Sequence, residues 1–260
     1  MWRHYAKLLM ALLATSFIAA GGALAGSYDD AMTAYDKGDY DTALKLLRPL
    51  ADRGNTGAQY SIGRMYAKGQ GVPKDEAEAK NWFSRANEQT KALQAYNISD
   101  FALALKTFRP LAEKGQVLAE YIVGLMYANG QGVPENYPEA LKWLTKAAEQ
   151  GEAKAQFSVG VIYFKGLGMP QNYAEALKWY RRSADQGYAI AQYNLGAMYA
   201  KGEAVAADPV TAHMLYSLAA QHGIKPAGEA KDRLAKSMTA AQIAEADKKA
   251  HDWKPKFEVE

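Results

Sequence analysis

The stretch of sequence that decides the fold is residues 152–187, which read EAKAQFSVGVIYFKGLGMPQNYAEALKWYRRSADQG. A shift of 36 residues in either direction aligns Gly160 with Gly124 and with Gly196. The same shift aligns tyrosines and alanines, namely Tyr127, Tyr163 and Tyr199, and Ala140, Ala176 and Ala212. Self-similarity at a period of this size is typical of arrays of stacked helix pairs. The sequence therefore predicts an all-α repeat protein.

Each repeat contains two predicted helices joined by a short loop. Apolar and small residues recur at helical spacing over residues 154–164 and again over 173–185. The loop between them, residues 165–170, contains a glycine that can take the left-handed conformation that ends a helix, and Pro170 cannot continue the first helix. The first helix is thus expected to stop in this loop.

Polar residues at fixed positions predict where the second helix of each pair begins. Asn172 followed by Glu175 has the spacing of a capping box, in which the first side chain accepts a hydrogen bond from a free backbone N–H. Equivalent positions hold Asn136 with Glu139, Asp75 with Glu78, and Asp208 alone. Gly151 and Gly187 are expected to end the second helices.

Small residues are expected where the two helices of a pair cross. Helix axes approach to about 8–10 Å when the side chains at the crossing are small. Gly160, Ala155 and Ala176 supply such positions, and the rings of Tyr163 and Trp179 would fill the space beside them. One pair buries too little surface to be stable alone, so stacking of several pairs is required.

The recurring pattern Ala-x-aromatic-x-x-Gly-x-x-Tyr, followed by Gly-x-Gly-Val-Pro and later by Ala-x-x-Trp-aromatic, resembles the Sel-1-like repeat, a relative of the tetratricopeptide repeat. Four copies match it: residues 58–90, 119–151, 155–187 and 191–223. The resemblance implies a right-handed α/α superhelical solenoid with a C-terminal capping helix. It also implies a protein that acts by binding other molecules.

The remaining segments extend this array. Residues 26–57 form a degenerate repeat related to the tetratricopeptide type, and residues 91–118 form a partial one, because residues 34–94 recur as 95–155 at an offset of 61. The helix that begins after Asp75 is expected to run to about Tyr96, and the next from about Asp100 to Lys114. Residues 224–260 are predicted to hold capping helices and a tail, with a Thr-x-x-Gln capping box at Thr239 and Gln242.

Residues 1–25 read as a cleaved signal peptide. Arg3 and Lys7 precede an apolar run that is shorter than the roughly 20 residues needed to span a bilayer, and Ala23 and Ala25 are the small residues expected before a cleavage site. The chain is therefore predicted to be exported, either periplasmic or secreted, with no membrane span after cleavage. It contains no cysteine, so disulfides play no part in its folding.

Charge and motifs argue against several classes of function. The formal net charge falls from +3 to +1 when Arg3 and Lys7 are removed. The remaining lysines and arginines are interleaved with acids and form no basic stripe, which argues against nucleic-acid binding. Asp36, Asp39 and Asp41 lack the closing glutamate of a calcium loop and are better explained by a turn and a helix cap. We find no nucleophile, metal or phosphate-loop motif and expect no enzyme activity, no cofactor and no metal.

Two functional hypotheses follow. The favoured one is a non-enzymatic scaffold that binds a protein, or a cell-envelope polymer, along its concave face; the alternative is an envelope hydrolase or its dedicated regulator. The first helix of each pair would line the concave face, and its open positions predict an apolar patch with a polar rim. The predicted binding residues are Ile122, Leu125, Asn129, Val161, Lys165, Asn194 and Lys201. The alternative is that these side chains pack against the neighbouring first helices.

Overall fold

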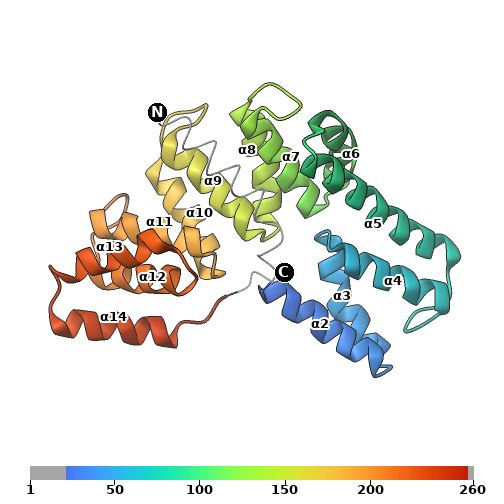
Figure 1. Ribbon diagram of the computed structural model, residues 1–260, viewed down its shortest axis with the longest axis horizontal. Coiled ribbons are helices and arrows are strands. Elements are labelled where there is room, and N and C mark those ends of the chain that lie inside the picture. Colours follow the sequence, from blue (N-terminus) through green and yellow to red (C-terminus); the bar gives the residue numbers. More distant parts are fainter. Residues whose placement is uncertain (1–21, 257–260) are drawn as a thin grey trace. The chain divides into compact units, whose positions relative to one another are not determined.

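The computed structural model describes residues 22–256, which form helices and no strands (Figure 1). The chain divides into two compact units, unit 1 up to Lys146 and unit 2 from Ala147, with the boundary inside a helix. In chain order the helices are α2 (Gly22–Asp36), α3 (Tyr40–Asp52), α4 (Thr56–Lys68), α5 (Glu76–Asn97), α6 (Phe101–Glu113), α7 (Val117–Asn129), α8 (Tyr137–Glu149), α9 (Ala153–Lys165), α10 (Tyr173–Asp185), α11 (Ala189–Lys201), α12 (Pro209–Gln221), α13 (Lys225–Ala235) and α14 (Ala240–Asp252).

Helices α9 and α10 form the pair predicted from residues 152–187, and their contact can be followed in Figure 1. Helix α9 ends at Gly166, which has φ of +64° and donates its N–H to the carbonyl of Ile162. The Glu175 N–H donates to Asn172 Oδ1 over 3.1 Å, so Asn172 caps α10 as predicted. The local signals for helix ends were thus sufficient to set this hairpin.

Gly160 allows α9 and α10 to pack closely where they cross. A Cβ atom at this position would lie 2.6 Å from Cδ1 of Tyr180, whose ring is buried and stacks on Phe157 with a centroid distance of 5.5 Å. The equivalent position in unit 1 is similar, since a Cβ on Gly124 would lie 2.6 Å from Cγ of Leu144. The predicted role of these glycines in close helix packing is confirmed.

A buried glutamine joins each of the first helices α4, α9 and α11 to the end of the helix before it. The side-chain Nε2 of Gln156 donates to the carbonyl of Ala148 over 3.1 Å. Gln59 donates in the same way to Ala51 over 2.9 Å, and Gln192 donates to Ala184 over 3.3 Å. The last carbonyls of a helix lack partners within it, so the glutamine side chain donates to one of them at these three junctions.

The duplication at an offset of 61 residues is visible in unit 1 as a repeated side-chain contact. The hydroxyl of Tyr35 donates to Gln70 Oε1 over 2.7 Å, and the hydroxyl of Tyr96 donates to Gln131 Oε1 over 3.0 Å. Helices α5 and α6 occupy the ranges predicted for the irregular segment, with Pro110 inside α6. The insertion therefore lengthens α5 and adds one helix, as expected.

The aspartates whose spacing partly resembles a calcium loop lie around the start of α3: Asp36 ends α2, Asp39 lies in the turn and Asp41 lies in the first turn of α3. The Thr42 N–H donates to Asp39 Oδ1 over 3.2 Å, so Asp39 acts as a helix cap. No group of three or more His, Cys, Asp and Glu side chains that could hold a metal occurs between residues 22 and 256.

The C-terminal helices pack on α12, which both α13 and α14 contact. Helix α13 begins at Lys225, within the segment predicted to hold capping helices, and Pro226 lies in its first turn, where a missing N–H costs nothing. At the start of α14, Thr239 and Gln242 form the reciprocal capping box that the sequence predicts. His213 on α12 is 3% exposed and its Nδ1 lies 3.8 Å from Asp247 Oδ1 on α14.

Most of the predicted signal peptide lies outside the described residues. The described chain begins with α2 at Gly22, and the helical backbone continues through Ala25 and Gly26. Within the described range, no helix combines the length and the apolar character needed to cross a bilayer.

Candidate functional site

The predicted binding residues of unit 1 lie on α7. Ile122 and Leu125 are each 1% exposed, so they form no open apolar surface, and this part of the prediction is wrong. Helix α7 is buried along nearly all of its length, with Leu118, Tyr127 and Asn129 as its partly exposed positions. A helix that is apolar all round packs on more than one face, so helical spacing alone could not separate a second packing face from an open one.

The predicted binding residues of unit 2 lie on α9 and α11. Val161 is 3% exposed and belongs to the core, which corrects the prediction for this residue as well. Lys165 is partly buried, and desolvation lowers the pKa of its ammonium group. Asn194 donates from Nδ2 to the carbonyl of Ile190 over 2.8 Å, and Lys201 pairs with Glu203 at 3.5 Å. A binding role for these polar side chains, and for Asn129, stays a prediction.

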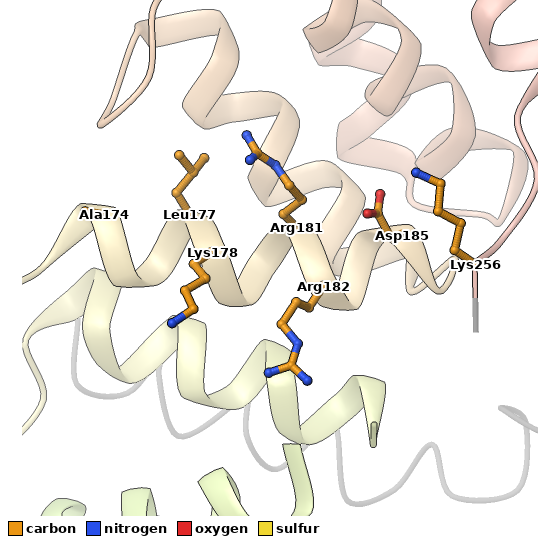
Figure 2. Close-up of a pocket in the computed structure, with 7 residues that line it drawn as sticks. All are labelled: Ala174, Leu177, Lys178, Arg181, Arg182, Asp185 and Lys256. Atoms are coloured by element: carbon orange, nitrogen blue, oxygen red, sulfur yellow. The ribbon is translucent and has the colours of Figure 1, made fainter. Parts of the chain in front are cut away.

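A different surface of unit 2 is hollowed and charged. It is a cavity of about 400 Å³ along one face of α10, and we call it the α10 groove (Figure 2). It is lined by Ala174, Leu177, Lys178, Arg181, Arg182, Asp185 and Lys256. The six residues from α10 follow one another at spacings of one or three, which is a single stripe of a helix.

Two cationic side chains of the α10 groove, Arg181 and Arg182, are held in place by neighbouring rings. Arg181 donates from its guanidinium to the hydroxyl of Tyr199 over 2.6 Å. The guanidinium of Arg182 lies 4.8 Å from the ring centroid of Trp179, a favourable distance for a cation on an aromatic face. Lys178 pairs with Glu175 at 3.8 Å and remains largely exposed. Side chains fixed in this way lose less conformational freedom when they bind a ligand.

The chain beyond α14 supplies the remaining wall of the groove. The backbone N–H of Lys256 donates to the carbonyl of Asp185 over 2.8 Å, which ties the C-terminal segment to the end of α10. The ring of Trp253 covers Gly187, since a Cβ on that glycine would lie 3.3 Å from Trp253 Cη2. Gly187 itself has φ of +87°, a conformation that favours glycine.

A second hollow lies in unit 1, on the face of α5. It has a volume of about 460 Å³ and is lined by Ala67, Glu76, Ala79, Lys80, Phe83, Ser84 and Asn87. Tyr60, which is 41% exposed, packs its ring against Phe83 and donates its hydroxyl to Asn87. With one acid and one lysine in its lining, this hollow carries no net charge, and its amide and acid side chains are spread along its length.

Comparison with known families identifies the repeat. The Sel1 repeat matches residues 33–55, 56–91, 117–152, 153–188 and 189–224. The chain belongs to the Sel1 repeat family. This confirms the resemblance drawn from the sequence, and it adds a match at residues 33–55, within the segment that we describe as a degenerate repeat.

Solved structures with the same fold cover most of this Sel1 repeat chain. The protective antigen c5321 of uropathogenic Escherichia coli, which displays an SLR fold, aligns with 86% of the chain and 52% of its own length, at 28% identity and a TM-score of 0.54. A Sel1 repeat protein from Oxalobacter formigenes aligns with 87% of the chain and 100% of its own length, at 29% identity and a TM-score of 0.54.

Curated relatives match shorter segments. The ERAD-associated E3 ubiquitin-protein ligase component HRD3B of Arabidopsis thaliana is 28% identical over 110 residues, which is 40% of this chain and 18% of the relative. An exopolysaccharide production negative regulator of Rhizobium leguminosarum bv. viciae is 36% identical over 56 residues, which is 22% of this chain and 21% of the relative. The chain thus spans about a fifth of the length of these relatives.

The α10 groove was missed by the sequence analysis, although part of its signal was present. Lys178, Arg181 and Arg182 lie on one stripe of a predicted helix, but the same helix carries Glu175 and Asp185, which made the charge look mixed. The contribution of Lys256 comes from 71 residues beyond Asp185 and could not be placed without the tertiary structure.

Proposed function

We propose that this chain is an exported, non-enzymatic Sel1 repeat scaffold that binds a protein partner, and that the α10 groove is part of its binding surface. The single observation that carries the proposal is the form of the groove. It is a stripe of one helix, and two of its cations, Arg181 and Arg182, are already oriented by Tyr199 and Trp179. Such a surface suits an elongated partner segment better than a small substrate, for which enclosed pockets are typical.

Two further points support binding over catalysis. The buried histidine of unit 2, His213, lies against α14 and is not part of the groove lining, and its ion-pair partner in the described part of the chain is Asp247. One relative is named as a component of a ubiquitin ligase and two as negative regulators, and proteins of both kinds act through contacts with others.

Site-specific photocrosslinking tests the proposal. Leu177 lines the groove, so replacing it with the photoreactive amino acid benzoylphenylalanine should give a covalent protein adduct in an envelope extract. The matched control carries the same amino acid at Glu229, an exposed position on α13 of the same unit, and should give none. Equal adducts at both positions, or none at either, would contradict a binding surface on α10.

The hydrolase alternative needs its own assay. Purified protein without residues 1–25 is incubated with peptidoglycan and with ester substrates, and soluble products are measured. Turnover that persists through repeated purification would overturn the non-enzymatic part of the proposal, whatever the crosslinking shows.

A further inference from the structure

The α10 groove has a strong local charge. Its lining contains four cationic side chains, from Lys178, Arg181, Arg182 and Lys256, and one carboxylate, Asp185, and Glu175 pairs with Lys178 beside it, so the local charge is 4 − 2 = +2. The chain without residues 1–25 has a formal net charge of only +1, from +3 less Arg3 and Lys7. The groove is therefore a local concentration of positive charge on a protein that is nearly neutral, and a partner of opposite charge fits it.

The length of the groove matches that of a short extended peptide. Ala174 and Asp185 are eleven positions apart on α10, which corresponds to about 16 Å at 1.5 Å per residue. An extended peptide covers about 3.3 Å per residue, so about five residues span the groove. Lys178 and Arg182 lie one turn apart, or about 6 Å, close to the roughly 6.7 Å between alternate side chains of an extended chain.

The side chains are arranged on two flanks of the helix. Figure 2 shows Lys178 and Arg182 pointing to one side of α10, and Leu177 and Arg181 pointing to the other. The guanidinium groups can each bind a carboxylate with two parallel hydrogen bonds, which a lysine cannot do. At the N-terminal end of the stripe, Ala174 and Leu177 offer apolar surface in place of charge, and the neighbouring Tyr173 is 37% exposed.

We propose that the α10 groove recognises an extended acidic peptide segment with carboxylates at alternate positions and an apolar residue at the end that meets Leu177. This inference rests on the proposed protein-binding function and states the chemistry of the partner. The apolar end favours a peptide over an anionic polysaccharide, which has no apolar side chain to place there. Asp185 disfavours a further carboxylate at the opposite end, which limits the acidic stretch to the part of the groove near Lys178, Arg181 and Arg182.

Fluorescence anisotropy with a defined probe tests the inference. The probe is a fluorescein-labelled peptide of alternating valine and glutamate, and its partner probe has glutamine in place of each glutamate. We expect the acidic peptide to bind and the glutamine peptide to bind at least about tenfold more weakly, because charged hydrogen bonds to guanidinium are roughly twice as strong as neutral ones. Binding should weaken further when the salt concentration is raised to about 0.5 M.

Two double variants with the same change of charge identify the binding surface. Lys178→Gln with Arg181→Gln removes two cations of the groove, and Lys225→Gln with Lys236→Gln removes two exposed cations elsewhere in unit 2. Circular dichroism checks that both fold. The first should weaken peptide binding about tenfold or more and the second less than about twofold, since distant exposed charges are screened by salt. Equal losses in the two variants would overturn the inference.

The binding assay also distinguishes two other ligands of the α10 groove from the acidic peptide. Tight binding of polygalacturonate with no binding of the acidic peptide would identify an anionic polymer as the ligand and overturn the inference. Peptide binding that appears only after Glu258→Gln with Glu260→Gln would assign the groove to the chain's own C-terminal residues, which also overturns it. If the peptide fails in every case but the photocrosslink at Leu177 persists, this inference fails and the proposed protein-binding function stands.

Discussion

Replacing Gly160 by alanine tests the packing that closes each helix pair. The new Cβ would lie 2.6 Å from Cδ1 and 2.7 Å from Cε1 of Tyr180, while ordinary contacts begin at 3.4 Å, so the ring must move by about 0.8 Å. That ring is 2% exposed and stacks on Phe157, which leaves it little room. The perturbation is one methyl group against a rigid, buried ring.

The expected magnitude is a balance of two opposed effects. Overpacking of a well-filled core costs about 1–3 kcal/mol. Alanine gains about 1 kcal/mol over glycine within a helix. The net change for Gly160→Ala is a destabilisation of about 1 kcal/mol, which lowers Tm by about 2–4 °C in a chain of this size.

Gly228→Ala is the matched control. Gly228 also lies inside a helix of unit 2, and the nearest atom to its added Cβ is 4.0 Å away, so only the helix preference acts. Thermal unfolding followed by circular dichroism should show Tm raised for Gly228→Ala and lowered for Gly160→Ala. In a Tyr180→Ala background the clash is gone, and Gly160→Ala should become stabilising. Equal rises in Tm for the two glycine variants would refute the packing argument.

Three further predictions concern processing, pH and capping. Ala25→Arg should block signal cleavage, so mass spectrometry should find residues 1–25 retained on this variant and absent from the exported wild type. Burial lowers the pKa of His213 although Asp247 opposes it, so its contribution to stability is present above the unfolded pKa of about 6.5 and is lost as the pH falls below it. The drop in Tm from pH 8 to pH 5 should therefore be smaller in His213→Leu than in the wild type, and an equal drop would contradict this role. Asn172→Ala removes the acceptor for the Glu175 N–H and should cost about 1 kcal/mol in urea unfolding, whereas Gln171→Ala, one residue earlier, should cost less.

The sequence by itself determined the helices and their pairing, because the signals involved are local. Gly166 ends α9 through its left-handed backbone conformation, and Asn172 begins α10 through its side-chain acceptor. Neither signal depends on what packs against the hairpin. The duplication at 61 residues likewise fixed the length of α5 from sequence offsets alone. Close packing at Gly160 also followed from sequence, because a glycine that recurs inside a helix implies contact with another element.

Only the tertiary structure decided which faces are open. Ile122, Leu125 and Val161 have the spacing of a free face, yet they are buried, because burial depends on what stacks against a helix and not on its own period. The α10 groove shows the converse. Three of its cations share one helix, but the fourth, Lys256, reaches the hollow only because the chain returns to the carbonyl of Asp185. Contacts between such distant residues leave no local pattern in the sequence.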